Sequence, residues 1–411
     1  MNKIKKLLAS PLLTGSLIML IGTNSVNFLA YIYHLFFGRL LGPSLYGELA
    51  ATLSLIGLLS SLFGFLGVVI VKFAATEDGE GRQRLFSWLG GIITKVAVIA
   101  LVLLFLAFPL IVRILSSSPF LAIQIGPIIY FTFFIMLNSS FLQGLLEFKK
   151  IVFIGVATWV VRFVLGYLLY MAGLSLPGVV FAILVSSLIA SEMAKYFLSK
   201  KGVRWVKKVY EKKDMVVRYS IPVLVMTVAT GSFIALDVIL ARYFLPSRDS
   251  GLYAALSTLG KIIVYASAPI LTVMFPLVSK SHGQGERTGK TLFLSGLATL
   301  LISTAIILVY KNFPGLAVNL LYGKSYIAVT PYLVRIGMLN LVYALDLLIV
   351  NYFLSRSKVA PSYFTVIAAV AQVIGIILFH GGIGAIINVS TFAASILFVI
   401  LAVYSVANLD K

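Results

Sequence analysis

Apolar runs long enough to cross a membrane alternate with short polar segments along the whole chain. A spanning helix needs about 20 mostly apolar residues. The pattern therefore predicts an all-α polytopic membrane protein with about twelve transmembrane helices, about six in each half. The expected spans are approximately 14–36, 46–70, 87–109, 121–143, 151–172, 178–198, 217–241, 252–277, 291–310, 328–350, 360–379 and 383–405.

A motif in the connection after the first span returns about 200 residues later, at the corresponding place in the second half. The first copy is GRLLGPSLYGELAA, Gly38 to Ala51, and the second is ARYFLPSRDSGLYAA, Ala241 to Ala255. Each copy contains an Arg, a Pro, a Gly and an Ala-Ala pair in the same order. Pro and Gly are typical of turns, so each copy is expected to join two spanning helices.

Two weaker echoes support an internal duplication. Polar loops with Gly-x-Gly follow the second span of each half, at 76–82 and 281–287, and Phe-Leu pairs recur at 141–142 and 353–354. Three echoes in one order predict two six-helix lobes, residues 1–198 and 216–411, related as a parallel repeat.

Composition agrees with the membrane class, since 60% of the residues are hydrophobic, 11% are charged and the mean hydropathy is +1.06. A soluble domain carries about 25% charged residues. The net charge of +20 fits the positive-inside rule and anionic lipids, so no nucleic-acid partner is expected. The absence of cysteine excludes disulfides, thiol catalysis and Cys-ligated metals.

The most basic segment joins the two predicted lobes and reads SKKGVRWVKKVYEKKDM, residues 199–215. Val203, Val206 and Tyr210 fall near one helical face, which predicts a short helix lying on the cytoplasmic leaflet. A disordered basic linker is the alternative. The bias of Lys and Arg toward alternate loops predicts that this linker and both chain termini are cytoplasmic, in the cytoplasmic (plasma) membrane.

The segment from Arg39 to Gly47 resembles the oligosaccharide (Wzx-type) flippases of the polysaccharide transporter family. So do Asp237, Arg242, the Gly251-Leu252-Tyr253 triplet and the Phe275-Pro276 pair. This family belongs to the multidrug/oligosaccharidyl-lipid/polysaccharide exporter superfamily. The resemblance implies two six-helix lobes around a central cavity that opens alternately to each side and moves a lipid-linked sugar. One departure is Leu245, where the first copy of the motif has Gly42.

Four basic residues lie inside predicted spans: Lys95, Arg162, Lys261 and Arg335. One charge at the bilayer centre costs about 2.5–3.5 kcal/mol. These side chains are therefore expected to face a cavity, a partner group or an anionic ligand. Arg162 is the deepest, about 16 Å from either end of its span, too far for its side chain to reach water.

Five further residues are candidates for gating or ion coupling. Asp237 and Asp346 are acidic and lie about a turn from the ends of their spans, where interfacial placement is the alternative. Arg39 and Arg242 belong to the two motif copies. Pro269 lies inside a span and removes a helical hydrogen bond, which predicts a bend that moves during lobe opening.

No enzyme constellation is present, because the three histidines, His34, His282 and His380, lie far apart. The leading interpretation is a flippase for an anionic lipid-linked oligosaccharide, with membrane lipids as further partners. The alternatives are a cation-coupled multidrug exporter, which should need buried carboxylates, and a non-transporting scaffold. No cofactor or metal is expected apart from a coupling ion of unknown identity, and a monomer is favoured.

Overall fold

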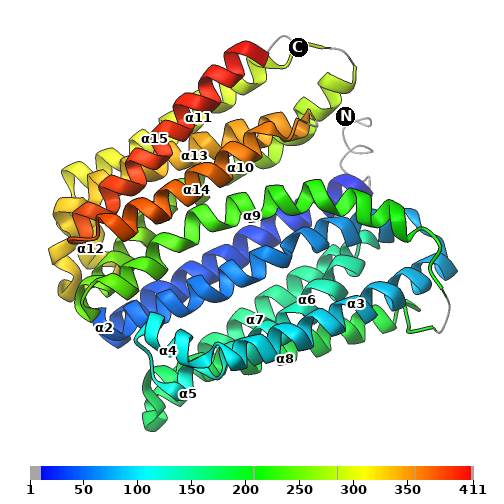
Figure 1. The fold of residues 1–411 in the computed structure, drawn as a ribbon, viewed down its shortest axis with the longest axis horizontal. Coiled ribbons are helices and arrows are strands. Elements are labelled where there is room, and N and C mark those ends of the chain that lie inside the picture. The colour runs from blue at the N-terminus through cyan, green and yellow to red at the C-terminus, as the bar shows by residue number, and fades with distance from the viewer. Residues whose placement is uncertain (1–10, 207–208, 285, 357, 409–411) are drawn as a thin grey trace, which may run out of the picture. The chain divides into compact units, whose positions relative to one another are not determined.

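The computed structural model describes residues 11–206, 209–284, 286–356 and 358–408. Throughout this part of the chain the regular structure is helical and contains no strand, which confirms the all-α prediction (Figure 1). The predictions for the two chain termini fall on residues 1–10 and 409–411, outside the described residues. The first half comprises α2 (Pro11–Thr76), α3 (Gly79–Leu106), α4 (Phe108–Leu115), α5 (Pro119–Ala122), α6 (Ile125–Gly144), α7 (Phe148–Leu169), η1 (Tyr170–Leu174) and α8 (Ser175–Ser199).

The second half also consists mainly of long helices, with two short elements between them. It comprises α9 (Lys213–Phe244), α10 (Ser247–Gly283), α11 (Gly289–Asn312), α12 (Pro314–Leu321), η2 (Lys324–Tyr332), α13 (Leu333–Ser355), α14 (Ala360–Leu378) and α15 (Ile383–Asn408). Every expected span falls largely within a helix, and the last two helices are separated at residues 379–382, which include the predicted break at 380–382.

The described residues form two compact units. Unit 1 contains residues up to Phe36 and Leu59–Leu224, and unit 2 contains Phe37–Leu58 together with the residues from Val225 onward. Helices α2 and α9 therefore each contribute to both units. The first motif copy, Gly38 to Ala51, belongs to unit 2 although it lies in the first half of the sequence.

In unit 1, α8 packs against both α6 and α7. Its buried face consists largely of small residues, including Ser186, Ala190 and Ala194. Small side chains let helix backbones approach closely, which replaces the missing hydrophobic driving force inside a membrane. The packing at Gly144 is equally close, because a Cβ atom there would lie 2.8 Å from the Cβ of Ala74.

In unit 2, α13 is the central helix and packs against α10, α11 and α15. A Cβ atom at Gly260 would lie 2.3 Å from the amide nitrogen of Asn340, and one at Gly337 would lie 2.9 Å from Ile307. These glycines bring α13 close to its neighbours. The side chains buried on α13 include the sequence-predicted candidate Asp346.

Backbone breaks occur where the sequence supplies glycine or proline. Helix α2 consists of two helices joined across Gly42, which has φ 68° and ψ 174° and precedes Pro43. Gly42 thus marks the turn predicted in the first motif copy. In the second copy α9 ends at Phe244 and α10 begins at Ser247, with Pro246 between them. Both motif copies therefore join two helices, as expected.

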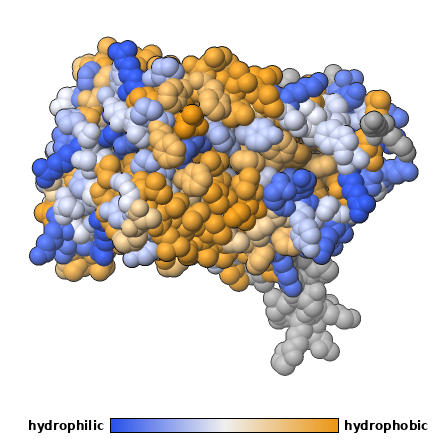
Figure 2. Space-filling model, turned by 90° about the horizontal axis from the view of Figure 1, so that it is seen from below, coloured by the Kyte–Doolittle hydropathy of each residue, from blue (hydrophilic) through white to orange (hydrophobic). Residues whose placement is uncertain are grey.

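Eight segments within the described residues are long and apolar enough to span a membrane, or up to nine if a bent pair in α2 is counted as one span. One of these segments, Phe148–Ser199, includes both α7 and α8. Large apolar side chains such as Leu301 and Phe392 are exposed on the helices, as suits contact with lipid. Figure 2 shows apolar side chains gathered over much of the face that it draws. The chain is a multi-pass membrane protein.

The predicted surface helix in residues 199–215 is not formed. Residues 203–206 and 209–212 have no helical structure, and we call residues 200–212 the strap. The backbone N–H of Val206 donates to Ser87 Oγ at 2.7 Å, and the carbonyl of Gly202 accepts from Gln83 Nε2 at 2.8 Å. These bonds to α3 take the place of helical ones. The described part of the strap thus bonds to α3, and the alternative of a disordered basic linker stays a prediction.

Candidate functional site

Two buried carboxylates lie in unit 2, Asp237 on α9 and Asp346 on α13, and each is only 4% exposed. Asp237 Oδ2 accepts hydrogen bonds from the hydroxyls of Tyr253, at 2.8 Å, and Ser257, at 3.4 Å. Asp237 Oδ1 and both carboxylate oxygens of Asp346 have no hydrogen-bond partner among the described residues. Both aspartates are thus buried in the core of unit 2.

A polar network surrounds these carboxylates. Gln372 Nε2 on α14 donates to the hydroxyls of Tyr343 and Ser390, each at 3.0 Å. Tyr343 lies within electrostatic range of both Asp237 and Asp346. The Gln372 Oε1 atom, like the free carboxylate oxygens, is buried without a partner among the described residues. A buried carboxylate is stable only if it is protonated or if it meets a cation.

The sequence analysis found the two aspartates but missed the polar residues around them. Tyr253 was part of the family motif, yet its contact with Asp237 was not anticipated. Tyr343 lies three residues before Asp346, a spacing that places both on one helix face and could have revealed it. Gln372 could have been recognised as an amide within an apolar run. Ser390 offered no comparable signal.

The two motif copies pack against each other within unit 2. A Cβ atom at Gly47 would lie 2.7 Å from the backbone nitrogen of Gly251, and one at Gly251 would lie 1.6 Å from the carbonyl oxygen of Pro43. The equivalent glycines of the repeat are therefore in direct contact, which only residues without a side chain allow. We call this contact the glycine contact.

Both motif arginines lie beside the glycine contact. Arg242 is buried, and its guanidinium donates to Ser250 Oγ at 3.2 Å and lies 3.7 Å from a carboxylate oxygen of Glu48. Arg39 donates to the carbonyl groups of Asn319, Leu320 and Leu321. A cation at the C-terminal end of α12 satisfies carbonyls that lack helical partners. Arg242 thus links the two motif copies, and Arg39 links the first copy to α12.

Arg162 lies on α7 in unit 1. Its Nε donates to Ser186 Oγ on α8 at 3.3 Å, and its guanidinium lies over the Trp159 ring, 4.5 Å from the centroid. The Trp159 ring also contacts that of Tyr33, with 5.5 Å between centroids. Stacking and a hydroxyl thus accommodate the charge in part. Arg162 does not line the unit 1 cavity described below.

The remaining predicted residues do not join these clusters. Lys95 on α3 and Arg335 on α13 are exposed on their helices, whereas Lys261 on α10 is half-buried. Pro269 is exposed, and α10 continues through it. The basic lining expected around Arg162 stays a prediction, since Lys95 shares its unit and the other two belong to unit 2.

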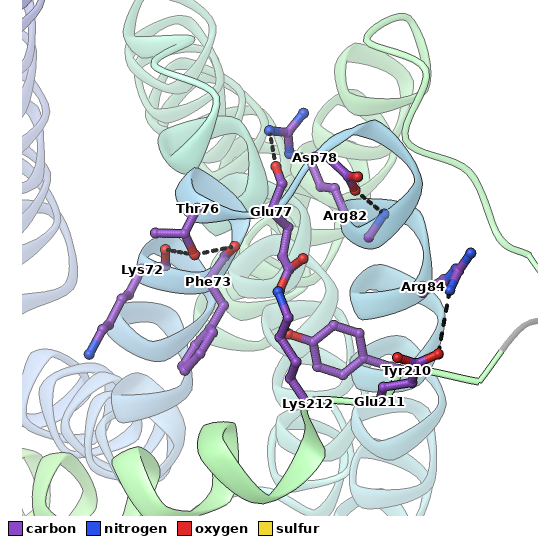
Figure 3. Close-up of polar contacts among 11 residues, drawn as sticks. Lys72, Phe73, Thr76, Glu77, Asp78, Arg82, Arg84, Tyr210, Glu211 and Lys212 are labelled. Carbon is purple, nitrogen blue, oxygen red and sulfur yellow. Dashed lines mark hydrogen bonds and ion pairs between the residues drawn. The ribbon is translucent and has the colours of Figure 1, made fainter.

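A polar cluster binds the strap to the rest of unit 1 (Figure 3). The buried carboxylate of Glu77, directly after α2, accepts from the Tyr210 hydroxyl and from Lys212 Nζ, both at 2.9 Å. Burial and the hydrogen bond to Glu77 raise the pKa of Tyr210 above its usual value. The Tyr210 ring also stacks on Trp88 of α3, with 5.6 Å between centroids.

A second fastening point involves Glu147, before α7, which forms ion pairs with Lys150 and with Lys201 of the strap. Burial alone would raise the pKa of Glu147, but hydrogen bonds from Lys201 and Lys150 outweigh it and hold that pKa below its usual value. The strap is therefore bound to the rest of unit 1 near both of its ends.

The fold is shared with solved transporters of low sequence identity. An inward-facing multidrug resistance MATE family transporter of the MOP superfamily aligns with a TM-score of 0.74 and 14% identity, over 93% of this chain and 95% of that one. The lipid II flippase MurJ, in an inward closed conformation, aligns with a TM-score of 0.75 and 15% identity, over 95% and 88%. A MOP superfamily transporter from Pyrococcus furiosus aligns with a TM-score of 0.65 and 17% identity, over 96% and 95%. The chain has the fold of this transporter superfamily.

A family model described as "Polysaccharide biosynthesis protein" matches residues 12–282. The chain belongs to this family, whose members are membrane transporters and flippases rather than enzymes. The resemblance found in the motif residues is thereby confirmed. No curated protein sequence matches the chain significantly.

Proposed function

We propose that the protein is a flippase that moves a lipid-linked oligosaccharide across the cytoplasmic membrane by alternating access. The observation that carries the proposal is the family match over residues 12–282, on a fold shared with a lipid II flippase. In this proposal about twelve spans form two six-helix lobes, with residues 199–215 between them on the cytoplasmic side. The glycine contact is a seal that opens and closes during transport.

The substrate side of the proposal rests on basic residues. Arg162 binds an anionic headgroup, because a guanidinium forms two parallel hydrogen bonds with a phosphate. Lys95, Lys261 and Arg335 complete the lining of the substrate path. The excess of basic over acidic groups inside predicted spans suits a pyrophosphate or an acidic sugar.

The proposal assigns ion coupling to the two buried carboxylates, Asp237 and Asp346, and the polar side chains around them. Asp237 and Asp346 are buried, and three of their four oxygens have no partner among the described residues. The donor set of carboxylate, amide and hydroxyl oxygens fits a hard monovalent cation or a proton. The same network supports a second candidate function, a cation-coupled multidrug exporter, in keeping with the similarity to MATE transporters.

A flipping assay in liposomes tests the proposed function. Purified protein is reconstituted with a fluorescent polyprenyl-pyrophosphate sugar. The fraction of fluorescence that a membrane-impermeant quencher added outside the liposomes removes is then followed. We expect translocation of the lipid-linked sugar and none of a cationic dye. Dye export without sugar translocation would establish the multidrug exporter instead, and movement of neither would leave the scaffold interpretation.

The variant Asp237→Asn is expected to lose at least about 90% of transport while folding normally. The amide keeps the size of the side chain but removes the charge that a coupling cation or proton requires. Transport is measured against pH and sodium concentration in the liposome assay. Asp214→Asn, at an exposed position near the start of α9, is the matched control and should retain normal transport. An unaltered ion dependence in Asp237→Asn would contradict the coupling role.

The proposed orientation is tested by labelling, because the chain has no native cysteine. Ser247→Cys, at the exposed start of α10, should react with an impermeant thiol reagent added outside cells. Val209→Cys, at a strap position that is 70% exposed, should react only after the membrane is permeabilised. The reverse pattern would invert the topology.

A further inference from the structure

Unit 1 contains a cavity of about 470 Å³ between α3, α6, α8 and the strap. Its volume lies within the range of about 300–1,000 Å³ that is typical of ligand pockets. None of the nine residues discussed above as substrate, gating or coupling candidates lines it. The cavity is therefore separate from those candidates.

The lining changes character with depth. At the end nearest the strap it contains Lys195, Ser199, Arg204 and Trp205. Toward the middle of α6 it is aromatic, with Tyr130, Phe131 and Phe134 on its wall. Along α8, Ser191 and Ser199 both line the cavity, and eight residues of helix correspond to about 12 Å. The cavity is thus amphipathic along its length.

The polar end carries a positive excess. Lys195 and Arg204 are opposed only by Glu192, which lies 3.4 Å from Lys195 Nζ, among the residues that line the cavity. The side chains of Lys195 and Glu192 are 68% and 62% exposed, so this ion pair is easily opened by a competing anion. A single phosphate could therefore bind the lysine in place of the glutamate.

The strap forms one wall of the cavity through Trp205. A Cβ atom at Gly90 would lie 2.7 Å from the Trp205 ring, so the indole packs directly on the α3 backbone. The Trp205 ring also meets that of Phe86 edge-on, with 6.4 Å between centroids. An occupant of the cavity would contact Trp205 and hence the segment that joins the two halves of the sequence.

We propose that this cavity binds an anionic phospholipid from the leaflet in which the strap lies. The phosphate lies between Lys195 and Arg204, and the first part of an acyl chain follows the aromatic wall formed by Phe131 and Phe134. Basic pockets between transmembrane helices at the membrane surface suit anionic headgroups, and each Lys or Arg adds attraction. This lipid is a bound partner of unit 1 and not the transported substrate.

Tryptophan quenching by brominated lipids tests the proposal. The experiment uses a variant that carries both Trp88→Phe and Trp159→Phe. Because the chain has three tryptophans, Trp205 is then the remaining one, and the fluorescence reports on it. The protein is reconstituted in phosphatidylcholine with rising fractions of brominated phosphatidylglycerol or brominated phosphatidylcholine. We expect half-maximal quenching at a fraction at least about fivefold lower for the anionic lipid.

The variants give effects of opposite sign. Lys195→Gln and Arg204→Gln should each weaken the preference for the anionic lipid by about fivefold. Glu192→Gln should strengthen it, because the competing carboxylate is removed. Lys149→Gln, an equal change of charge at an exposed position on α7 outside the cavity, should leave it unchanged.

Three results would overturn the proposal. Equal quenching by the two brominated lipids would show no anionic site. An equal loss of preference in Lys149→Gln and Lys195→Gln would show that the preference for the anionic lipid comes from the overall surface charge and not from a site in the cavity. Displacement of the brominated lipid by a polyprenyl phosphate, but not by unbrominated phosphatidylglycerol, would assign the cavity to the transport substrate.

Discussion

Replacing Gly251 with alanine is expected to open the packing between the two motif copies and to lower transport at least tenfold. The new Cβ atom would lie 1.6 Å from the Pro43 carbonyl oxygen, a backbone atom that cannot move aside alone. Alanine is otherwise favoured over glycine in a helix by about 1 kcal/mol. A loss of transport in Gly251→Ala would therefore come from the lost contact and not from a weaker helix.

Thiol labelling measures this opening directly. Thr52→Cys places a reporter at a fully buried position whose hydroxyl donates to the Glu48 carbonyl of its own helix. The reporter should be unreactive alone and should label at least tenfold faster with Gly251→Ala. Gly57→Ala is the matched control, because a Cβ atom there meets nothing within 4 Å. If the reporter stays protected in Gly251→Ala, the glycine contact is not a seal.

Replacing Arg162 with alanine is expected to abolish transport at normal membrane levels, and Arg162→Lys should weaken it. Alanine removes the charge, whereas lysine keeps the charge but loses the flat guanidinium that lies over Trp159. Lysine also cannot bind a phosphate through two parallel hydrogen bonds. The measurement is flipping of the lipid-linked sugar in liposomes, normalised to the amount of folded protein.

Ser186→Ala separates a binding role from a structural one. This change removes the hydroxyl that accepts from Arg162 at 3.3 Å and leaves the guanidinium in place. We expect only a severalfold loss of transport, with thermal stability close to that of the unaltered protein. Normal transport by Arg162→Ala would exclude the headgroup role, and a matching loss of stability and transport in both variants would make Arg162 a packing residue.

The helical fold was predictable from hydrophobicity because a membrane leaves few alternatives to helices for a polar backbone. The turn at Gly42 and the break at residues 380–382 followed from glycine and proline. The strap was mispredicted for a physical reason. Helical periodicity assumes that a backbone bonds to itself, whereas the backbone N–H of Val206, in the non-helical strap, donates to Ser87 of α3.

Individual residues of the candidate site could be predicted from the sequence, but the contacts between them could not. The cost of burying charge identified Asp237, Asp346 and Arg162 without any knowledge of their neighbours. The partners of Asp237 and Arg162 come from other helices, as Tyr253 and Ser186 do, and one sequence does not reveal which helices meet. The contact between Gly47 and Gly251 was equally inaccessible, although both glycines were recognised as members of a repeat.

Because Phe37–Leu58 belongs to unit 2, this segment is synthesised well before the residues that it packs against. Tyr46 and Leu49 from this segment are fully buried, yet the rest of unit 2 begins only at Val225. At about 5–20 residues per second, a ribosome needs on the order of ten to thirty seconds to translate the intervening chain. During that interval the segment has reached the membrane without its final neighbours. The helices made in this interval, or a membrane insertase, must shield its polar groups until the residues from Val225 onward are in place.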